Sequence, residues 1–239
     1  MDTIRIMHEG TLMVAHRGLS GLEKENTCSA FVAAGNRSHF GIETDIHPTI
    51  DGRFVCIHDN NTQRVGIDNL EVETSTFDTV RSVVLTDTDG AKGRVDLRIP
   101  TLEEYIRICK KYGKVSVLEI KGVFTRENLE KVIDIIKAED YLPSVVFIAF
   151  NIENLIILRE LLPDQPLQYL ISEFPDDLID TLLKYRLDLD IYYPALTEER
   201  VRALHERGIK VNCWTVNQPE TACELISWGV DFITSNILE

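Results

Sequence analysis

The centre of the chain carries the stretches VSVLEIK (115–121), TRENLEKVIDIIKAED (125–140) and SVVFIAF (144–150), which together decide the fold class. The first and third are short apolar runs typical of buried strands, and the second spaces its apolar residues as an amphipathic helix does. A helix between two strands favours a parallel pair, because a parallel connection needs a long crossover. The segment is therefore predicted to be one strand–helix–strand unit.

The same alternation extends over most of the chain. Eight strand candidates separated by helical stretches predict a parallel sheet closed into a TIM (β/α)8 barrel. The sequence has no GxGxxG pattern, which argues against an open dinucleotide-binding sheet. A length of 239 residues suits one catalytic domain spanning 1–239. The strand candidates lie at 12–18, 39–49, 115–121, 144–150, 166–171, 189–194, 209–217 and 230–236.

Two features depart from the repeat. DG at 51–52 turns the second strand candidate into RFVCIHD (53–59), which predicts a hairpin. The following stretch, 59–99, has no strong period and is predicted to be a small insertion near the barrel mouth. Only three residues follow Asn236, so the last helix of the barrel is predicted to be missing or vestigial.

Composition restricts the partners of the protein. A formal net charge of −14 argues against nucleic-acid binding, although a small phosphorylated ligand stays compatible with it. The five cysteines are scattered without metal-ligand spacing and are predicted to be reduced. No signal peptide or long apolar run is visible, so a cytoplasmic location without membrane insertion is predicted. The oligomeric state stays open.

Polar residues gather where the predicted strands end. In a parallel barrel these ends surround the functional mouth, so side chains that are distant in sequence are expected to meet there. Alternate residues of a strand point the same way, which places Glu43 beside Asp45 and Glu119 beside Lys121. The candidate site residues are His16, Arg17, Glu43, Asp45, His58, Glu119, Lys121 and Trp214.

The three carboxylates of Glu43, Asp45 and Glu119 predict a metal site. Buried together they would repel one another, whereas a divalent cation would hold all three ionised. Oxygen ligands suit a hard cation, and Ca²⁺ and Mg²⁺ both stay open. The structural alternative is a buried ion pair between Glu119 and Lys121.

The other candidates suggest acid–base and phosphate chemistry. His16 and His58 at one rim are candidates for the general acid and base, and Arg17 suits bidentate contact with phosphate oxygens. Trp214 is either a core residue or a ligand contact. His47, close to the hairpin turn, is predicted to lie at the surface or behind the site residues.

These residues stand in motifs that resemble the glycerophosphodiester phosphodiesterase family. The likeness runs in order along nearly the whole chain, with HRG, ETD, HD and EIK as its most specific parts. Two departures are Lys24, where the family usually has proline, and TSNILE (234–239), where an acidic residue and proline are common. The matching stretches are AHRG (15–18), ENT (25–27), GIETDIHPTIDGRFVCIHD (41–59), Arg64, IPTLEEY (99–105), LEIK (118–121), VNCWTVN (211–217) and GVDFITSN (229–236).

The resemblance implies hydrolysis of a glycerophosphodiester to glycerol 3-phosphate and an alcohol. It also implies roles for the site: His16 and His58 are catalytic, the three carboxylates bind the metal, and Arg17 and Lys121 contact the phosphate. Two alternatives stay open. One is a phospholipase-D-type lyase on a related barrel that releases a cyclic phosphate, and the other is a phosphodiester-binding barrel without turnover. The preferred alcohol is not readable from the sequence.

Overall fold

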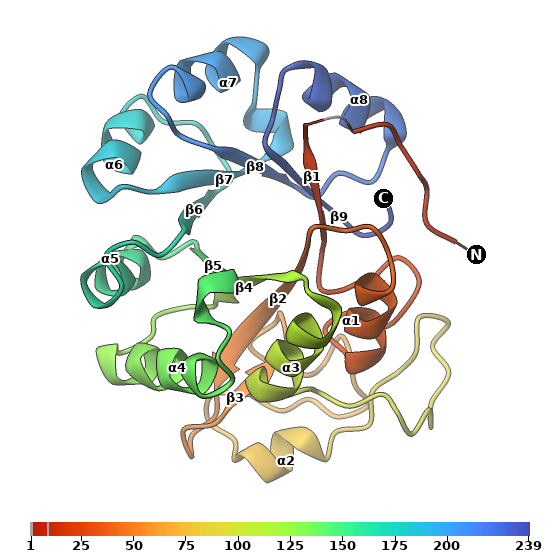
Figure 1. Cartoon of the computed structure of the whole chain (residues 1–239). Helices are drawn as coiled ribbons and strands as arrows, with labels where there is room; N and C mark the ends of the chain where they lie inside the picture. Colours follow the sequence, from red (N-terminus) through yellow and green to blue (C-terminus); the bar gives the residue numbers. More distant parts are fainter. Residues whose placement is uncertain (1, 9) are drawn as a thin grey trace.

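Eight parallel strands close into a barrel in the computed structural model, which describes residues 2–8 and 10–239 (Figure 1). Neighbours follow the order β1-β9-β8-β7-β6-β5-β4-β2, and pairing of β1 with β2 closes the ring. The predicted TIM barrel is therefore confirmed. The barrel strands are β1 (Leu12–Ala15), β2 (Gly41–Pro48), β4 (Val115–Ile120), β5 (Val145–Ala149), β6 (Leu167–Ile171), β7 (Asp188–Tyr192), β8 (Val211–Trp214) and β9 (Phe232–Ser235).

Helices surround this ring of strands (Figure 1). In α3 the Thr101 hydroxyl accepts from the Glu104 N–H and the Glu104 carboxylate accepts from the Thr101 N–H, so the two residues cap the helix start reciprocally. Gly113 ends the same helix in the left-handed conformation, at the stop that its sequence predicts. The helices of the ring are α1 (Cys28–Gly35), α3 (Leu102–Tyr112), α4 (Arg126–Ala138), α5 (Ile152–Leu161), α6 (Leu178–Tyr185), α7 (Glu198–His205) and α8 (Pro219–Ser227), with 3₁₀ turns at Leu142–Ser144 and Tyr193–Ala195.

Strand β3 (Phe54–Cys56) stands outside the barrel ring. It pairs antiparallel with the end of β2 through a turn in which Gly52 has a positive φ of 75°. This hairpin folds the chain back along β2, so that His58, which follows β3, returns toward the barrel mouth. Helix α2 (Phe77–Arg81) lies in the segment between β3 and α3, beside α3 in Figure 1.

The segment between β3 and α3 has a small apolar core of its own. Its valines and leucines pack on Val55 and Ile57 of the hairpin, and they form a cluster separate from the main core. Burial of these side chains holds an otherwise irregular stretch in place. The buried members are Val55, Ile57, Val65, Val72, Val80, Val83, Leu85, Leu97 and Ile99.

The two ends of the described chain pair with each other. The Ile4 N–H donates to the Ile237 carbonyl at 3.0 Å, and the Glu239 N–H donates to the Ile4 carbonyl at 2.9 Å. Within the described residues, the stretch after β9 contains this pairing and no helix.

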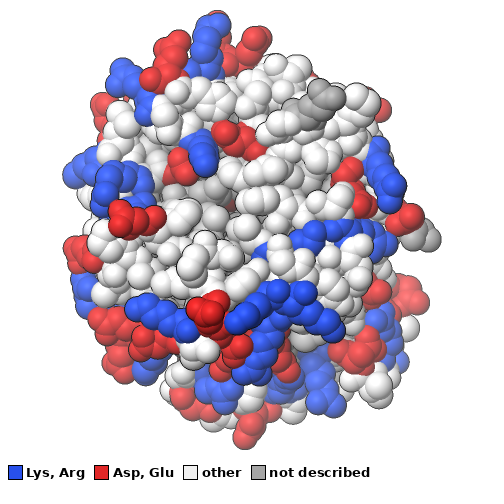
Figure 2. Space-filling model, in the orientation of Figure 1, with Lys and Arg blue, Asp and Glu red and all other residues white. Residues whose placement is uncertain are grey.

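Part of the barrel interior is apolar, beside buried polar side chains such as Gln168 and Asn212. Val14, Val117, Ile148 and Leu170 come from four different strands and form one buried cluster. Around the outside, Lys and Arg mix with Asp and Glu over the helices on the face shown in Figure 2. In the part of the chain that the structure describes, each helix is too short or too polar to cross a membrane.

Gly18 is a position where the fold requires glycine. Its φ is 73°, and a Cβ at this residue would lie 2.7 Å from the Cβ of Ala30. We expect Gly18→Ala to lower the free energy of unfolding by roughly 2–5 kcal/mol, because backbone strain and a clash add together. Urea denaturation of the purified variant measures this loss.

Gly113 provides the matched control. It has a similar φ of 63°, but a Cβ there meets no atom within 4 Å. Gly113→Ala should therefore lower the free energy of unfolding by about 1 kcal/mol, through backbone strain alone. Equal losses in the two variants would contradict the packing argument at Gly18.

Candidate active site

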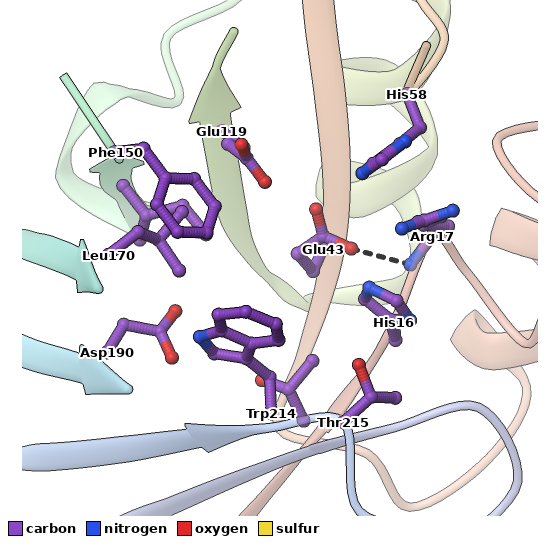
Figure 3. A pocket seen from close by; sticks show the side chains of 12 residues that line it. His16, Arg17, Glu43, His58, Glu119, Phe150, Leu170, Asp190, Trp214 and Thr215 are labelled. Atoms are coloured by element: carbon purple, nitrogen blue, oxygen red, sulfur yellow. Dashed lines mark hydrogen bonds between the residues drawn. The ribbon is translucent and has the colours of Figure 1, made fainter. Parts of the chain in front are cut away.

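One cavity opens at the carboxyl ends of the barrel strands. It holds about 430 Å³, part of which is open to solvent. Figure 3 shows His16, Arg17 and His58 on one side of Glu43, with Phe150, Leu170 and Asp190 on the other. The cavity is therefore charged on one wall and mainly apolar on the opposite wall. Its lining residues are His16, Arg17, Glu43, His58, Glu119, Ile148, Phe150, Leu170, Asp190, Trp214, Thr215 and Thr234.

All eight predicted site residues meet at this cavity. His16, Arg17, Glu43, His58, Glu119 and Trp214 line it directly. Asp45 and Lys121 join them through contacts: Lys121 Nζ lies 2.8 Å from Glu119 Oε1 and 3.5 Å from Asp45 Oδ1.

The three carboxylates form a compact group. Glu43, Asp45 and Glu119 each offer an oxygen within 4.8 Å of the others, and all three are buried. The strand register explains this arrangement, because β2 and β4 pair in parallel with Asp45 directly opposite Glu119. Glu43 lies two residues earlier on β2 and so faces the same side.

Burial and mutual repulsion disturb the protonation of this group. Burial, reinforced by the charges of Asp45 and Glu119, raises the pKa of Glu43 well above its ordinary value. Burial and Asp45 raise the pKa of Glu119 to about 8. For Asp45, burial alone would raise the pKa, but the positive charges of Lys121 and Arg17 lower it.

The donor set fits a hard divalent cation. Three carboxylate oxygens that share one buried space, two of them on groups reluctant to ionise alone, become mutually compatible when a cation balances their charge. Oxygen ligands are those that Ca²⁺ and Mg²⁺ prefer. The acidic cluster can therefore bind a metal ion.

Arg17 links the cluster to the loop after β1. Its backbone N–H donates to Glu43 Oε2 at 2.6 Å, and its guanidinium Nη1 donates to Glu25 Oε1 at 2.9 Å. Arg17 has a φ of 55°, and Gly18 after it is also left-handed. The HRG turn thus shapes the backbone around the Glu43 carboxylate.

Asn26 supports the same cluster from the neighbouring loop. Its side-chain amide donates to Asp45 Oδ2 at 2.8 Å and accepts from the Thr44 hydroxyl at 2.7 Å. Thr27 caps helix α1 by accepting from the Ala30 N–H.

His16 is held by an amide. Its Nδ1 lies 2.7 Å from Oδ1 of Asn236, which also accepts from the Ser20 hydroxyl at 2.9 Å. Burial, and then the positive charge of Arg17, lower the pKa of His16 to about 4. The ring is therefore neutral near pH 7 and able to accept a proton.

His58 is held by a carboxylate. Its Nδ1 lies 2.7 Å from Oδ1 of Asp59, and Arg64 Nε donates to Asp59 Oδ2 at 2.7 Å. Burial lowers the pKa of His58, whereas the carboxylates of Asp45 and Asp59 act in the opposite direction. The two histidines thus have different partners behind them.

Of the two positions expected for His47, at the surface or behind the site residues, the structure shows the second, because its side chain is fully buried. Its Nε2 lies 3.2 Å from the carbonyl oxygen of His58, and its Nδ1 lies 3.0 Å from Glu73 Oε1. The strand continues through Pro48, so His47 belongs to the β2–β3 pairing and lies behind the backbone of His58.

Sequence reasoning missed Asn26 and four further residues of the site. Asp59 and Asn236 hold the histidine rings, Glu25 holds Arg17, and Asp190 lines the apolar wall. Asp190 had a usable signal, because it lies inside an apolar strand stretch, LDIYYP (189–194). Asp59 and Asn236 stand in the matching stretches HD and GVDFITSN, but no role could be read for them, since any polar residue at a strand end can face solvent.

The fold and the site together define a class of protein. A TIM barrel that presents paired imidazoles, three carboxylates and two cationic side chains at its mouth has the groups needed for metal-assisted phosphodiester hydrolysis. Glu43 and Asp45 lie within β2, and the other groups come from a strand end or from the loop that follows it, where barrel enzymes carry their chemistry.

Comparison with known proteins gives the family. The sequence profile of the glycerophosphoryl diester phosphodiesterase family matches residues 16–238. A glycerophosphodiester phosphodiesterase from Caldanaerobacter subterraneus subsp. tengcongensis is 29% identical, over 95% of this chain and 94% of its own. The uncharacterized protein YqiK of Bacillus subtilis is 30% identical, over 92% of this chain and 93% of its own. The chain belongs to this family and is by class an enzyme that hydrolyses glycerophosphodiesters.

Solved structures agree with the fold. A glycerophosphodiester phosphodiesterase from Parabacteroides distasonis aligns with a TM-score of 0.80 at 27% identity, covering 95% of this chain and 93% of its own. A phosphodiesterase from Oleispira antarctica, solved in complex with its product sn-glycerol-3-phosphate, aligns with a TM-score of 0.86 at 24% identity, covering 95% and 93%. The resemblance stated from the motifs is thus confirmed.

The partner of His16 can be tested by changing its charge. We expect Asn236→Asp to raise the pKa of His16 from about 4 toward its ordinary value, because a carboxylate at Nδ1 stabilises the protonated ring. Titration of the imidazole resonances by NMR measures the shift.

Ser20→Ala is the matched control for this variant. It removes the other hydrogen bond to Asn236 Oδ1 without changing any charge. The pKa of His16 should then stay near its starting value. A titration that is the same in Asn236→Asp and in the unmodified protein would contradict the contact.

Proposed function

We propose that the chain hydrolyses glycerophosphodiesters to glycerol 3-phosphate and an alcohol, using one divalent cation, Ca²⁺ or Mg²⁺. The observation that carries this proposal is the buried group of Glu43, Asp45 and Glu119 beside two imidazoles in one cavity. When bound, the cation would polarise a phosphoryl oxygen and balance the charge that develops on it.

Arg17 and Lys121 are proposed to bind the phosphate. Both side chains already lie against Asp45, with Arg17 Nε 3.7 Å and Lys121 Nζ 3.5 Å from its oxygens. Charged donors in a partly buried site stabilise negative charge on phosphoryl oxygens more strongly than they would in water. Trp214 is proposed to contact the substrate from the apolar wall of the cavity.

His16 and His58 are proposed to move the protons. Nδ1 of each ring is engaged, which leaves Nε2 to serve the substrate. His16 stands against a neutral amide and suits the base that removes a proton from the attacking oxygen. His58 stands against the Asp59 carboxylate, which stabilises a protonated ring, and it suits the acid that protonates the departing oxygen.

The two alternative functions predict different products. A phospholipase-D-type lyase would use the same groups but would stop at a cyclic phosphate, and a phosphodiester-binding barrel would bind substrate without turnover. The cytoplasmic location, the absence of nucleic-acid binding and the single domain 1–239 with its insertion at 59–99 stay predictions.

Turnover and product identity test the proposed function. We expect the purified protein with Ca²⁺ or Mg²⁺ to convert glycerophosphocholine to glycerol 3-phosphate, and EDTA to stop the reaction. ³¹P NMR follows substrate and product together. A cyclic phosphate as the final product would support the lyase, and binding without any turnover would support the non-catalytic barrel.

Thermal unfolding of the purified protein tests cation binding independently of turnover. At cation concentrations about 100-fold above Kd, binding should stabilise the fold by about 2.7 kcal/mol, which raises Tm by several degrees. Glu119→Gln should lose most of this rise because it removes one ligand charge. An equal rise in both proteins would place the cation elsewhere.

The two histidine roles can be separated with an activated leaving group. We expect His16→Ala and His58→Ala each to lower kcat on glycerophosphocholine by about 10²–10⁴-fold while leaving thermal unfolding intact. On glycerophospho-p-nitrophenol, His58→Ala should recover much of its rate, because p-nitrophenolate leaves without a proton.

His16→Ala should stay slow on both substrates, since proton removal from the attacking oxygen is needed in each case. Recovery in His16→Ala and not in His58→Ala would reverse the assignment. Near-normal turnover of glycerophosphocholine in either variant would refute the catalytic role of that residue.

A further inference from the structure

Asp190 is a buried carboxyl that the proposed chemistry does not use. It lies on β7, its side chain is 2% exposed, and it lines the cavity. Within residues 2–8 and 10–239, its Oδ1 has no hydrogen-bond partner. A buried polar atom without a partner destabilises the folded protein, so its presence calls for a physical explanation.

Trp214 has a second open polar atom on the same side of the cavity. Its indole Nε1 is buried and also lacks a hydrogen-bond partner in the described chain. Figure 3 shows this nitrogen on the edge of the ring that faces Asp190. A donor and a carboxyl from the neighbouring strands β8 and β7 therefore face each other without bonding.

The acidic cluster does not account for Asp190. The group of carboxylates able to hold a cation consists of Glu43, Asp45 and Glu119, and among the residues described Asp190 is not part of it. Figure 3 shows Asp190 on the opposite side of the cavity from His58 and Arg17. Apolar Phe150 and Leu170 lie on the same side as Asp190, and Leu170 is its partner in the pairing of β6 with β7.

We propose that Asp190 and the Trp214 indole N–H together recognise a hydroxyl group of the ligand at the apolar wall, and so act as specificity-determining residues. This inference rests on the proposed function, because the hydroxyl belongs to the glycerol end of a glycerophosphodiester whose phosphate lies at the acidic cluster. The apolar side chains then contact the carbon chain between the two polar ends.

The chemistry of the pair selects a hydroxyl over an ammonium group. A hydroxyl oxygen can accept from the indole N–H while its proton is donated to the carboxyl, so one group satisfies both open atoms. An ammonium group has only donors and would leave the indole N–H unpaired. Burial also raises the pKa of Asp190 well above its ordinary value, which fits a neutral partner better than a cation.

The test compares two ligands that differ only in this hydroxyl. Calorimetry in the presence of Ca²⁺ or Mg²⁺ measures binding of sn-glycerol 3-phosphate and of 2-hydroxypropyl phosphate, which keeps the middle hydroxyl and lacks the terminal one. We expect the unmodified protein to bind glycerol 3-phosphate about tenfold more tightly, the value of one hydrogen bond in a buried site.

Substitutions then assign the preference to the pair. Asp190→Ala should bring the ratio of the two affinities close to one, and Trp214→Phe, which keeps the ring but removes the N–H, should lower it. Asp188→Asn is the control on the same strand. Its carboxylate accepts from the N–H of Lys210, just before the neighbouring strand β8, and the variant should keep the full ratio.

Several outcomes would overturn the proposal. These are an unchanged ratio in Asp190→Ala, an equal loss of affinity for both ligands, and binding of free choline that disappears in Asp190→Ala. Turnover of glycerophosphocholine is measured separately, so a failure of the proposed function is distinguishable from a failure of hydroxyl recognition.

Stability gives a second readout. Because Asp190 has an unpartnered oxygen, Asp190→Asn and Asp190→Ala should leave Tm unchanged or raise it in the absence of ligand. A lower Tm in Asp190→Asn would mean that the carboxyl supports the fold, and it would overturn a role in ligand recognition.

Discussion

Three carboxylates held within 4.8 Å of one another in a buried cavity are the constraint around which this end of the barrel is built. Like charges in a medium of low polarity repel strongly, so each group needs compensation from nearby. Lys121 and Arg17 supply positive charge, Asn26 supplies an amide donor to Asp45, and the left-handed turn at Arg17 directs a backbone N–H to Glu43. A bound cation would complete this compensation. The surrounding loops are therefore shaped by the electrostatic requirement of the cluster.

Much of this arrangement could be predicted from the sequence, because a parallel barrel leaves little choice. A charged residue within an apolar strand is costly to bury without a partner, so it is expected to face the barrel mouth. This expectation correctly grouped Glu43, Asp45 and Glu119 with His16. The closed barrel followed from eight repeats of one strand–helix pattern. These predictions depend on strand parity and strand ends, which can be read from a single sequence.

The partners of the catalytic side chains could not be predicted in the same way. Asp59 and Asn236 lie in loops, where a polar residue is ordinary, and only the three-dimensional structure shows that they contact the histidine rings. For His47 the sequence left two positions open, at the surface or behind the site residues, and only the structure shows that the hairpin packs it behind His58. Asp190 fits the expectation for charged residues in apolar strands, since it interrupts the apolar stretch LDIYYP (189–194) and its side chain lines the cavity.

The segment between β3 and α3 belongs to the site as much as the barrel does. Arg64 from this segment binds Glu25 at 2.6 and 2.9 Å and Asp59 at 2.7 Å. Glu25 also accepts a hydrogen bond from Arg17, and Asp59 also contacts His58. Arg64 therefore links the carboxylate that holds Arg17 to the carboxylate that holds His58. Ionic groups that share a network constrain one another more than isolated surface pairs do. Displacing the segment would therefore loosen Arg17 and His58 together, and the small apolar core around Val65 and Val80 contributes to the geometry of the active site from outside the barrel.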